Sequence, residues 1–117
     1  MAGKLTTHVL DTAIGKPAKG VRIDLLRGTG SAQEFLKTAY SNADGRIDVP
    51  LLEGPAVVPG VYQLVFHVAD YHRAVGNLDA GKFLDQVPVV FTIADPAGHY
   101  HVPLLVSPWA YSTYRGS

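Results

Sequence analysis

The amino-acid sequence predicts an all-β protein, a sandwich of two sheets with one short helix. Twelve Gly and eight Pro among the 117 residues are spread between short apolar runs, which is the pattern of strands joined by tight turns. Within these runs apolar and polar residues alternate, so that each strand can bury one face. About eight such strands bury those faces most simply against one another, in two packed sheets.

The first half of the chain is predicted to contribute four strands, at residues 5–11, 21–25, 35–40 and 46–49. Segments rich in Gly, Pro and Asn separate them, at residues 15–20, 28–30 and 42–45. Gly45 suits the positive φ that such a turn requires. In the first strand, the alternation puts Thr6 and His8 on the face opposite to Leu5 and Val9.

The second half is predicted to contribute four more strands and the helix, with the strands at residues 61–69, 87–93, 100–106 and 109–115. Asp70 is expected to cap the helix and Gly76 to end it. Because Tyr100 belongs to the apolar face of its strand, His99 and His101 are predicted to point away from the core.

Composition bounds the class of protein before any motif is considered. Residues 1–117 fit a single domain. Ten Lys and Arg balance ten Asp and Glu, which argues against a nucleic-acid module and against a polybasic membrane binder. The absence of Cys removes disulfides, thiolate metal sites and a Cys nucleophile. No apolar run approaches the roughly 18 residues of a membrane-spanning helix, and no signal-peptide core follows Met1, so a cytoplasmic location is expected.

Judged from residue spacing alone, the outward-facing histidines are the strongest candidates for a catalytic or binding role. A site built from His8, His99 and His101 would lie on the outer surface of a sheet, where another subunit is the simplest cover that excludes water. A single surface histidine is most often merely solvated, and Arg46 is most simply a solvated residue at a strand start. His99 and His101 could also form a metal pair, although zinc would need a further ligand.

Three segments carry a resemblance to a known family. They are Leu5-Thr6-Thr7-His8-Val9-Leu10-Asp11 with the following Gly15-Lys16-Pro17-Ala18, the turn Asn42-Ala43-Asp44-Gly45-Arg46, and the stretch from His99-Tyr100-His101-Val102-Pro103-Leu104-Leu105 to Tyr114-Arg115-Gly116-Ser117. Together they resemble the transthyretin-related 5-hydroxyisourate hydrolases over essentially the whole chain. The terminal Tyr-Arg-Gly-Ser is the specific signature of these enzymes, and the hormone-carrying transthyretins lack it together with the catalytic histidines.

The resemblance implies a fold, an assembly and a reaction. The fold is a transthyretin-like sandwich of two four-stranded sheets with one short helix. The assembly is a homotetramer, a dimer of dimers, with active sites at the dimer–dimer interface. The reaction is a step of urate degradation in purine metabolism, in which water attacks a ring carbonyl of 5-hydroxyisourate and opens an amide-like C–N bond. The product is 2-oxo-4-hydroxy-4-carboxy-5-ureidoimidazoline, and neither a metal nor an organic cofactor is implied.

The resemblance also assigns the site residues by their motifs. The implied catalytic residues are His8, Arg46, His101 and Ser117. The implied substrate-binding residues are His8, Arg46, Tyr114, Arg115 and Gly116. A neutral imidazole, with its ordinary pKa of about 6.5, can accept a proton from water near neutral pH, and the fork of an arginine suits urate-like oxygens and developing negative charge.

Some roles and alternatives remain open at this stage. The role of His99 is unassigned, and the sequence does not decide which histidine is the general base. A transthyretin-like carrier of a small molecule or hormone is the alternative function, and a metal-binding module built on His99 and His101 is a second. Neither alternative would accelerate the decay of 5-hydroxyisourate.

Overall fold

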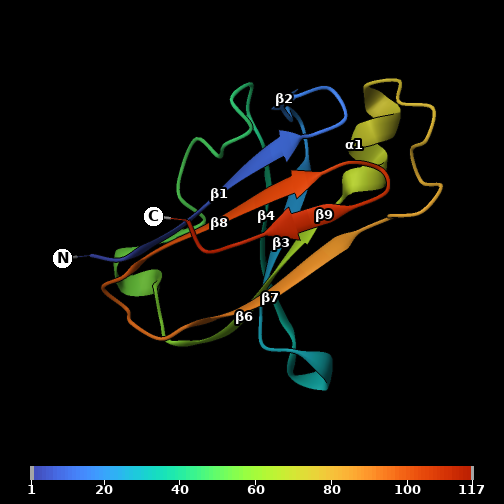
Figure 1. Ribbon diagram of the computed structural model, residues 1–117. Helices are drawn as coiled ribbons and strands as arrows, with labels where there is room; N and C mark the ends of the chain where they lie inside the picture. Colours follow the sequence, from blue (N-terminus) through green and yellow to red (C-terminus); the bar gives the residue numbers. More distant parts are fainter. Residues whose placement is uncertain (1, 117) are drawn as a thin grey trace.

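Two sheets face each other in the computed structural model, which describes residues 2–116 (Figure 1). The first sheet has the order β2-β1-β8-β9, and the additional short strand β5 also pairs with β1. Its strands are β1 (Lys4–Asp11), β2 (Lys16–Pro17), β5 (Leu52–Glu53), β8 (His99–Val106) and β9 (Tyr111–Thr113). The second sheet has the order β4-β3-β6-β7. Its strands are β3 (Arg22–Arg27), β4 (Glu34–Tyr40), β6 (Gly60–Phe66) and β7 (Val87–Ile93). The all-β sandwich with one helix is therefore confirmed.

The first sheet differs from the predicted four strands. The strand predicted at residues 46–49 is wrong, because only Arg46 pairs, in a single bridge with His8. Residues 47–49 bend away from β1 instead, where Asp48 Oδ1 accepts a 2.8 Å hydrogen bond from Asn42 Nδ2. The main chain returns to β1 at Leu51, whose N–H donates to the carbonyl oxygen of Leu5. The two-residue strand β2 lies in the segment predicted as a loop at residues 15–20, and β5 lies where no strand was predicted. Together they bring the first sheet to five strands.

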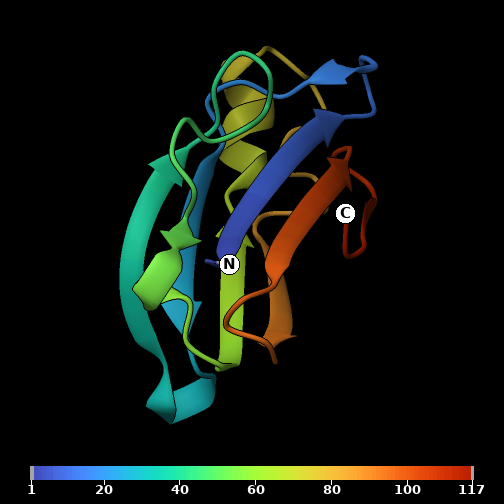
Figure 2. The ribbon, with the colours of Figure 1, turned by 90° about the vertical axis from the view of Figure 1, so that its left-hand side faces the viewer.

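The helix α1 (Val68–Ala74) lies at the end of the sandwich where β1 and β8 end (Figures 1 and 2). It begins earlier than predicted, so Asp70 lies in its first turn, not at the N-cap, which is His67. Val68 is fully buried, and burial alone cannot distinguish a strand end from a helix start. The predicted end is confirmed, since Gly76 adopts a φ of 77° just beyond the helix. Within residues 2–116 no helix is long and apolar enough to cross a membrane.

The core between the sheets follows the predicted alternation. Side chains from both sheets are fully buried there, including Leu5, Ile23, Leu64, Phe66 and Leu104, each with 0% of its surface exposed. Burial of each such side chain stabilises the fold by about 1.5–3 kcal/mol. The same alternation leaves the other face of the first sheet for polar side chains.

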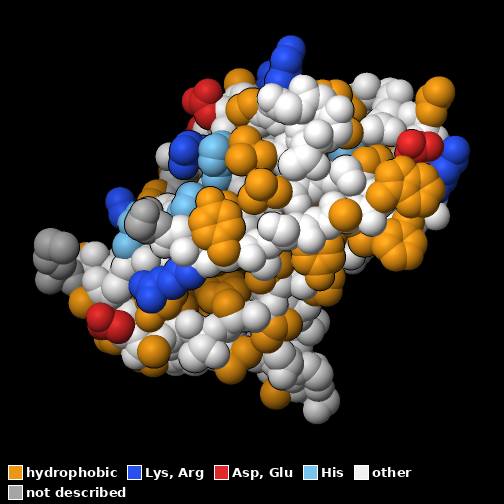
Figure 3. All heavy atoms as spheres, viewed as in Figure 1, with side chains coloured by type: hydrophobic (Ala, Val, Ile, Leu, Met, Phe, Trp, Pro, Cys, Tyr) orange, Lys and Arg blue, Asp and Glu red, His pale blue; other side chains and the backbone are white. Residues whose placement is uncertain are grey.

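The pairing of β1 with β8 positions that polar face. The two strands are parallel, and their register sets Thr6 opposite His101 and Lys4 opposite His99. Thr6, His8 and His101 are half-buried on the outer face, while His99 is exposed. In Figure 3 histidine side chains gather beside Lys and Arg side chains on the side of the molecule where both termini lie.

A second polar cluster is buried under α1. The hydroxyl of Tyr71 donates a 2.7 Å hydrogen bond to the carboxylate of Asp11, and burial together with this carboxylate raises the pKa of Tyr71. Beside it His72 is 1% exposed, and neither ring nitrogen has a hydrogen-bond partner among the described residues. Burial lowers the pKa of His72, although the charge of Asp11 opposes the shift. His72 is therefore buried as a neutral ring.

This burial predicts a pH-dependent stability. Because the pKa of His72 is lower in the folded state, the unfolded chain binds more protons, and stability falls as the pH drops through about 6.5. His72→Leu removes the titrating group and two unsatisfied polar atoms at similar volume, and an unsatisfied buried group costs about 1–3 kcal/mol. We expect the variant to melt no lower than the wild type at pH 7.5 and to lose less Tm between pH 7.5 and 5.5. The exposed-histidine control His99→Gln should lose as much Tm as the wild type over this pH range. An equally large loss of Tm in His72→Leu would contradict this account.

Candidate active site

A cavity of about 210 Å³ lies on the outer face of the first sheet. Its lining combines titratable, hydroxyl and apolar side chains, contributed by Thr6, Thr7, Arg46, Ile47, His99 and His101. His8 borders the cavity because its backbone pairs with that of Arg46. Residues from both ends of the sequence and from the turn at residues 42–46 therefore meet at one place.

The turn that carries Arg46 is held by one side chain. Asn42 Oδ1 accepts hydrogen bonds from the backbone N–H groups of Asp44, at 2.9 Å, and Arg46, at 3.1 Å. Gly45 adopts a φ of 75°, and a Cβ there would lie 2.3 Å from the carbonyl oxygen of Val9. Only glycine therefore allows the turn to approach β1 this closely, and that approach brings Arg46 to the cavity.

The same turn fixes the protonation pattern of His8. Its Nε2 lies 2.8 Å from the carbonyl oxygen of Asp44. A carbonyl oxygen can only accept, so Nε2 carries the proton. In the neutral ring, the lone pair of His8 is therefore on Nδ1.

His101 is held by a hydroxyl group instead. Its Nδ1 lies 2.8 Å from Thr6 Oγ1, and the same oxygen lies 2.9 Å from His99 Nε2. Within residues 2–116, the Nε2 of His101 has no hydrogen-bond partner. Burial lowers the pKa of His101, and the charges of Arg46, His99 and His8 lower it further. His101 is thus a neutral imidazole at pH 7, with an open nitrogen, beside a permanently charged arginine.

The chain end packs directly against His101. The backbone N–H of Gly116 donates a 2.8 Å hydrogen bond to the carbonyl oxygen of His101, and a Cβ at Gly116 would lie 2.5 Å from Cδ2 of that ring. Arg115 supports this arrangement, since its Nη2 donates to the carbonyl oxygen of His99 at 3.2 Å and its guanidinium lies over the ring of Tyr100 at 4.2 Å. Ser117 lies outside the described residues.

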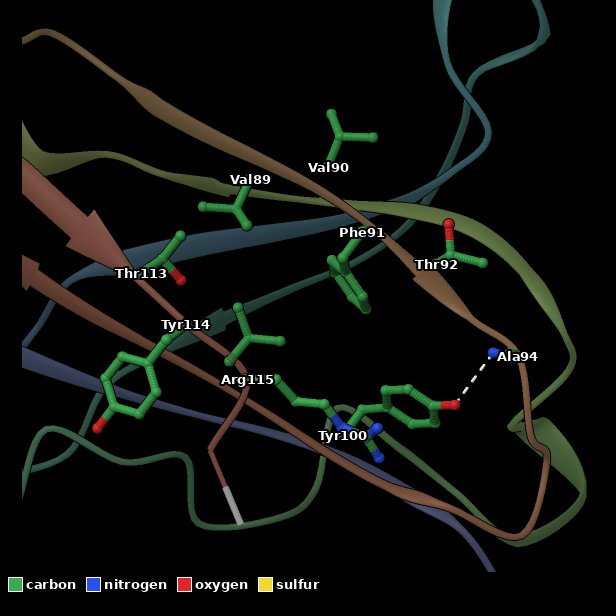
Figure 4. A pocket seen from close by; sticks show the side chains of 10 residues that line it. Val89, Val90, Phe91, Thr92, Ala94, Tyr100, Thr113, Tyr114 and Arg115 are labelled. Carbon is green, nitrogen blue, oxygen red and sulfur yellow. Dashed lines mark hydrogen bonds between the residues drawn. The ribbon is translucent and has the colours of Figure 1, made fainter.

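Two of the predicted site residues face a different cavity. Tyr114 and Arg115 line a larger, mainly apolar cavity of about 360 Å³. Figure 4 shows the Arg115 side chain running beside the ring of Tyr100, whose hydroxyl accepts a hydrogen bond from the N–H of Ala94. This cavity opens between β7 and the chain segment that follows β9. The structure therefore brings together His8, Arg46, His101 and Gly116, and it does not bring the side chains of Tyr114 and Arg115 to them.

The sequence-based assignment omitted three residues of the cavity lining, Thr6, Thr7 and Ile47, and of these Thr6 contacts the histidines. The alternation did place it on the face of His8, but its contact with His101 depends on the parallel register of β1 and β8. Nothing in the spacing of either strand reveals that register.

The arrangement is suited to proton transfer and to binding of an anionic oxygen. His99 and His101 lie 6.2 Å apart between ring centroids, with the Thr6 hydroxyl between them. Among the described residues, no group of three or more His, Asp or Glu side chains could hold a metal ion. A neutral imidazole can deprotonate water, and a guanidinium can stabilise the oxyanion that forms on attack at a carbonyl.

Comparisons with known proteins place the chain among close relatives. The model of the HIUase/Transthyretin family matches residues 5–116. The 5-hydroxyisourate hydrolase 2 of Rhizobium meliloti is 56% identical over 117 residues, covering 99% of this chain and 98% of the relative. The crystal structure of (S)-allantoin synthase superposes with a TM-score of 0.92 at 43% identity, covering 99% of this chain and 44% of that one. The 5-hydroxyisourate hydrolase of Klebsiella pneumoniae superposes with a TM-score of 0.80 at 33% identity, covering 97% and 99% of the two chains.

The electrostatics of the cavity can be tested without a substrate. The positive charge of Arg46 opposes protonation of His101, so Arg46→Gln should raise the pKa of His101 toward its ordinary value. Titration of the histidine ring resonances by NMR measures this shift. Arg73→Gln, on the exposed face of α1, is the matched control and should leave the pKa of His101 unchanged. A pKa of His101 that does not move in Arg46→Gln would show that the two groups are not electrostatically coupled.

Proposed function

The chain belongs to the HIUase/transthyretin family, and we infer that within it the chain is an enzyme, a 5-hydroxyisourate hydrolase. The observation that carries this inference is the 56% identity with the hydrolase of Rhizobium meliloti, which extends over 99% of the chain. The cavity supports the same reading, because it contains a proton acceptor and an oxyanion-binding group side by side. The substrate is 5-hydroxyisourate, and the reaction is hydrolysis.

We propose that His101 is the general base. Its open Nε2 takes a proton from a water molecule as the water oxygen bonds to a ring carbonyl carbon of the substrate. The carbonyl oxygen becomes an oxyanion, which Arg46 stabilises by charge and by its planar pair of donors. The oxyanion then collapses, the C–N bond breaks, and the leaving nitrogen takes a proton from the His101 imidazolium. The product carboxyl group then ionises, because the pKa of a carboxyl group lies far below neutral pH.

The other site residues have supporting roles in this proposal. The Nδ1 lone pair of His8 accepts a hydrogen bond from a ring N–H of the substrate, since its Nε2 is committed to the Asp44 carbonyl. Gly116 gives His101 room and a backbone hydrogen bond. Tyr114 and Arg115 contribute by fixing the chain end that carries Gly116, and Ser117 stays a proposed member of the site.

We further propose that the protein is a homotetramer, a dimer of dimers. Two separate surfaces support this assembly. The outer face of the first sheet carries half-buried Thr6, His8 and His101, which need a cover to exclude water. The end strands β7 and β9 leave large apolar or aromatic side chains exposed, among them Val90 and Tyr111, and uncovered edge strands readily pair with another chain. A cytoplasmic location remains a prediction, which cell fractionation tests.

The proposed function predicts catalysis that depends on both histidines. The wild type should accelerate the decay of freshly generated 5-hydroxyisourate, followed by ultraviolet absorbance. His101→Asn and His8→Asn should fold normally, because neither side chain belongs to the core, and each should lose roughly 10²–10⁴-fold in kcat/KM. His67→Asn, on the second-sheet side of the molecule, is the matched control and should keep its activity. A wild type that leaves the spontaneous decay rate unchanged would instead favour a binding protein.

The proposed assembly predicts that activity follows the tetramer. Light scattering coupled to size-exclusion chromatography should report four copies of the chain at micromolar concentration. On dilution, specific activity should fall in step with the tetramer fraction, because separation of the dimers exposes the cavity to bulk water. A monomer with full specific activity would disprove this arrangement.

A further inference from the structure

The hydroxyl of Thr6 occupies an unusual position between two imidazole rings. Its oxygen is within hydrogen-bond distance of His99 Nε2, at 2.9 Å, and of His101 Nδ1, at 2.8 Å. The hydroxyl has one proton, so it can donate to one ring nitrogen only and must accept from the other. The proton positions on the two rings are therefore coupled through Thr6.

The two ends of this hydrogen-bonded chain differ in exposure. His101 is half-buried, and its outer nitrogen is the one that would face a substrate in the cavity. His99 is exposed. The charged or titratable groups that act on His101 are Arg46, His99 and His8, and each of them opposes its protonation. Among residues 2–116, no carboxylate hydrogen-bonds to His101, and the Thr6 hydroxyl is the side-chain partner of its Nδ1.

We propose that Thr6 is a positioning residue that relays protons between His101 and the exposed His99. This inference rests on the proposed hydrolase function, because it explains how His101 exchanges protons with solvent while substrate covers its Nε2. Hydrolysis to a carboxylate product also releases one proton at neutral pH, and the relay offers a path for it.

The relay balances protons at every atom. In the resting site, His101 Nδ1–H donates to Thr6 Oγ1, and the Thr6 hydroxyl donates to His99 Nε2. When His101 Nε2 gains a proton from water, the Nδ1 proton passes to Thr6 Oγ1, and the former Thr6 proton passes to His99 Nε2. His99 then releases its Nδ1 proton to solvent. One proton enters at His101 and one leaves at His99, and the reverse movement resupplies His101.

The first test reads proton positions and needs no substrate. Two-dimensional NMR that correlates ring nitrogens with ring protons identifies which nitrogen of each histidine is protonated. In the wild type, His99 and His101 should both carry their proton on Nδ1. Thr6→Val keeps the shape of the side chain but removes the hydroxyl, so it should change the protonated nitrogen of at least one ring. Unchanged ring nitrogens in Thr6→Val would overturn the coupling.

The second test is kinetic and includes conservative rescue. Thr6→Val should lower kcat roughly tenfold, with KM unchanged, which is less than the loss expected for His101, the group that takes the proton from the attacking water. Thr6→Ser retains the hydroxyl and should restore kcat, and Thr29→Val, exposed in the segment between β3 and β4, is the matched control. His99→Ala should also lose kcat and regain it as imidazole is added to the buffer. Full kcat in Thr6→Val, or no recovery in Thr6→Ser, would overturn the relay.

These outcomes are separable from failure of the proposed function. If the wild type does not accelerate 5-hydroxyisourate decay, the hydrolase assignment fails, while the NMR experiment still decides whether Thr6 couples the two rings. If the wild type is active and the Thr6 variants behave as the control does, the relay alone is wrong.

Discussion

The parallel pairing of β1 with β8 is the constraint on which the candidate site depends. Its register sets Thr6 beside His101, and the alternation of each strand turns these side chains to the same outer face. A shift of one residue in either strand would send that strand's polar residues into the core and its apolar residues outward. Burial of Leu5, Val9 and Leu104 on the inner face therefore also holds the polar side chains of the outer face in place.

Two glycines then bring other segments onto this pair of strands. Gly45 lets the turn at residues 42–46 touch β1, and Gly116 lets the chain end touch the ring of His101. In both places a Cβ would lie well inside contact distance of its neighbour, so close packing requires glycine, and at Gly45 the positive φ requires it as well. The outcome is a cavity in which burial and charge act in the same direction: burial, Arg46 and the neighbouring rings keep His101 neutral, and a neutral ring is the form that accepts a proton.

Local pattern and family motif predicted different parts of the molecule. Alternation was sufficient for the sandwich, for the buried faces and for the outward histidines, because a strand's side-chain period is a property of the strand itself. It failed at residues 46–49, where a side-chain hydrogen bond from Asn42 to Asp48 holds the chain in a bend, and at Val68, whose burial fits either a strand or a helix. The motifs named His8, Arg46 and His101, which do meet. They could not show that Arg115 turns toward Tyr100 or that Thr6 lies between two rings, since both contacts depend on packing between segments distant in sequence.

The same parallel pair has a consequence for how the protein is made. Thr6 and His101 are separated by 95 positions in the chain, so β1 leaves the ribosome long before β8 exists. Until then its main-chain groups can pair with β2, with β5 and with the segment around Arg46, and the edge that β8 will occupy stays open. Long-range pairing of this kind slows folding and leaves an exposed edge prone to aggregation. The nascent chain therefore spends nearly its whole synthesis as a potential client for chaperones that shield such edges.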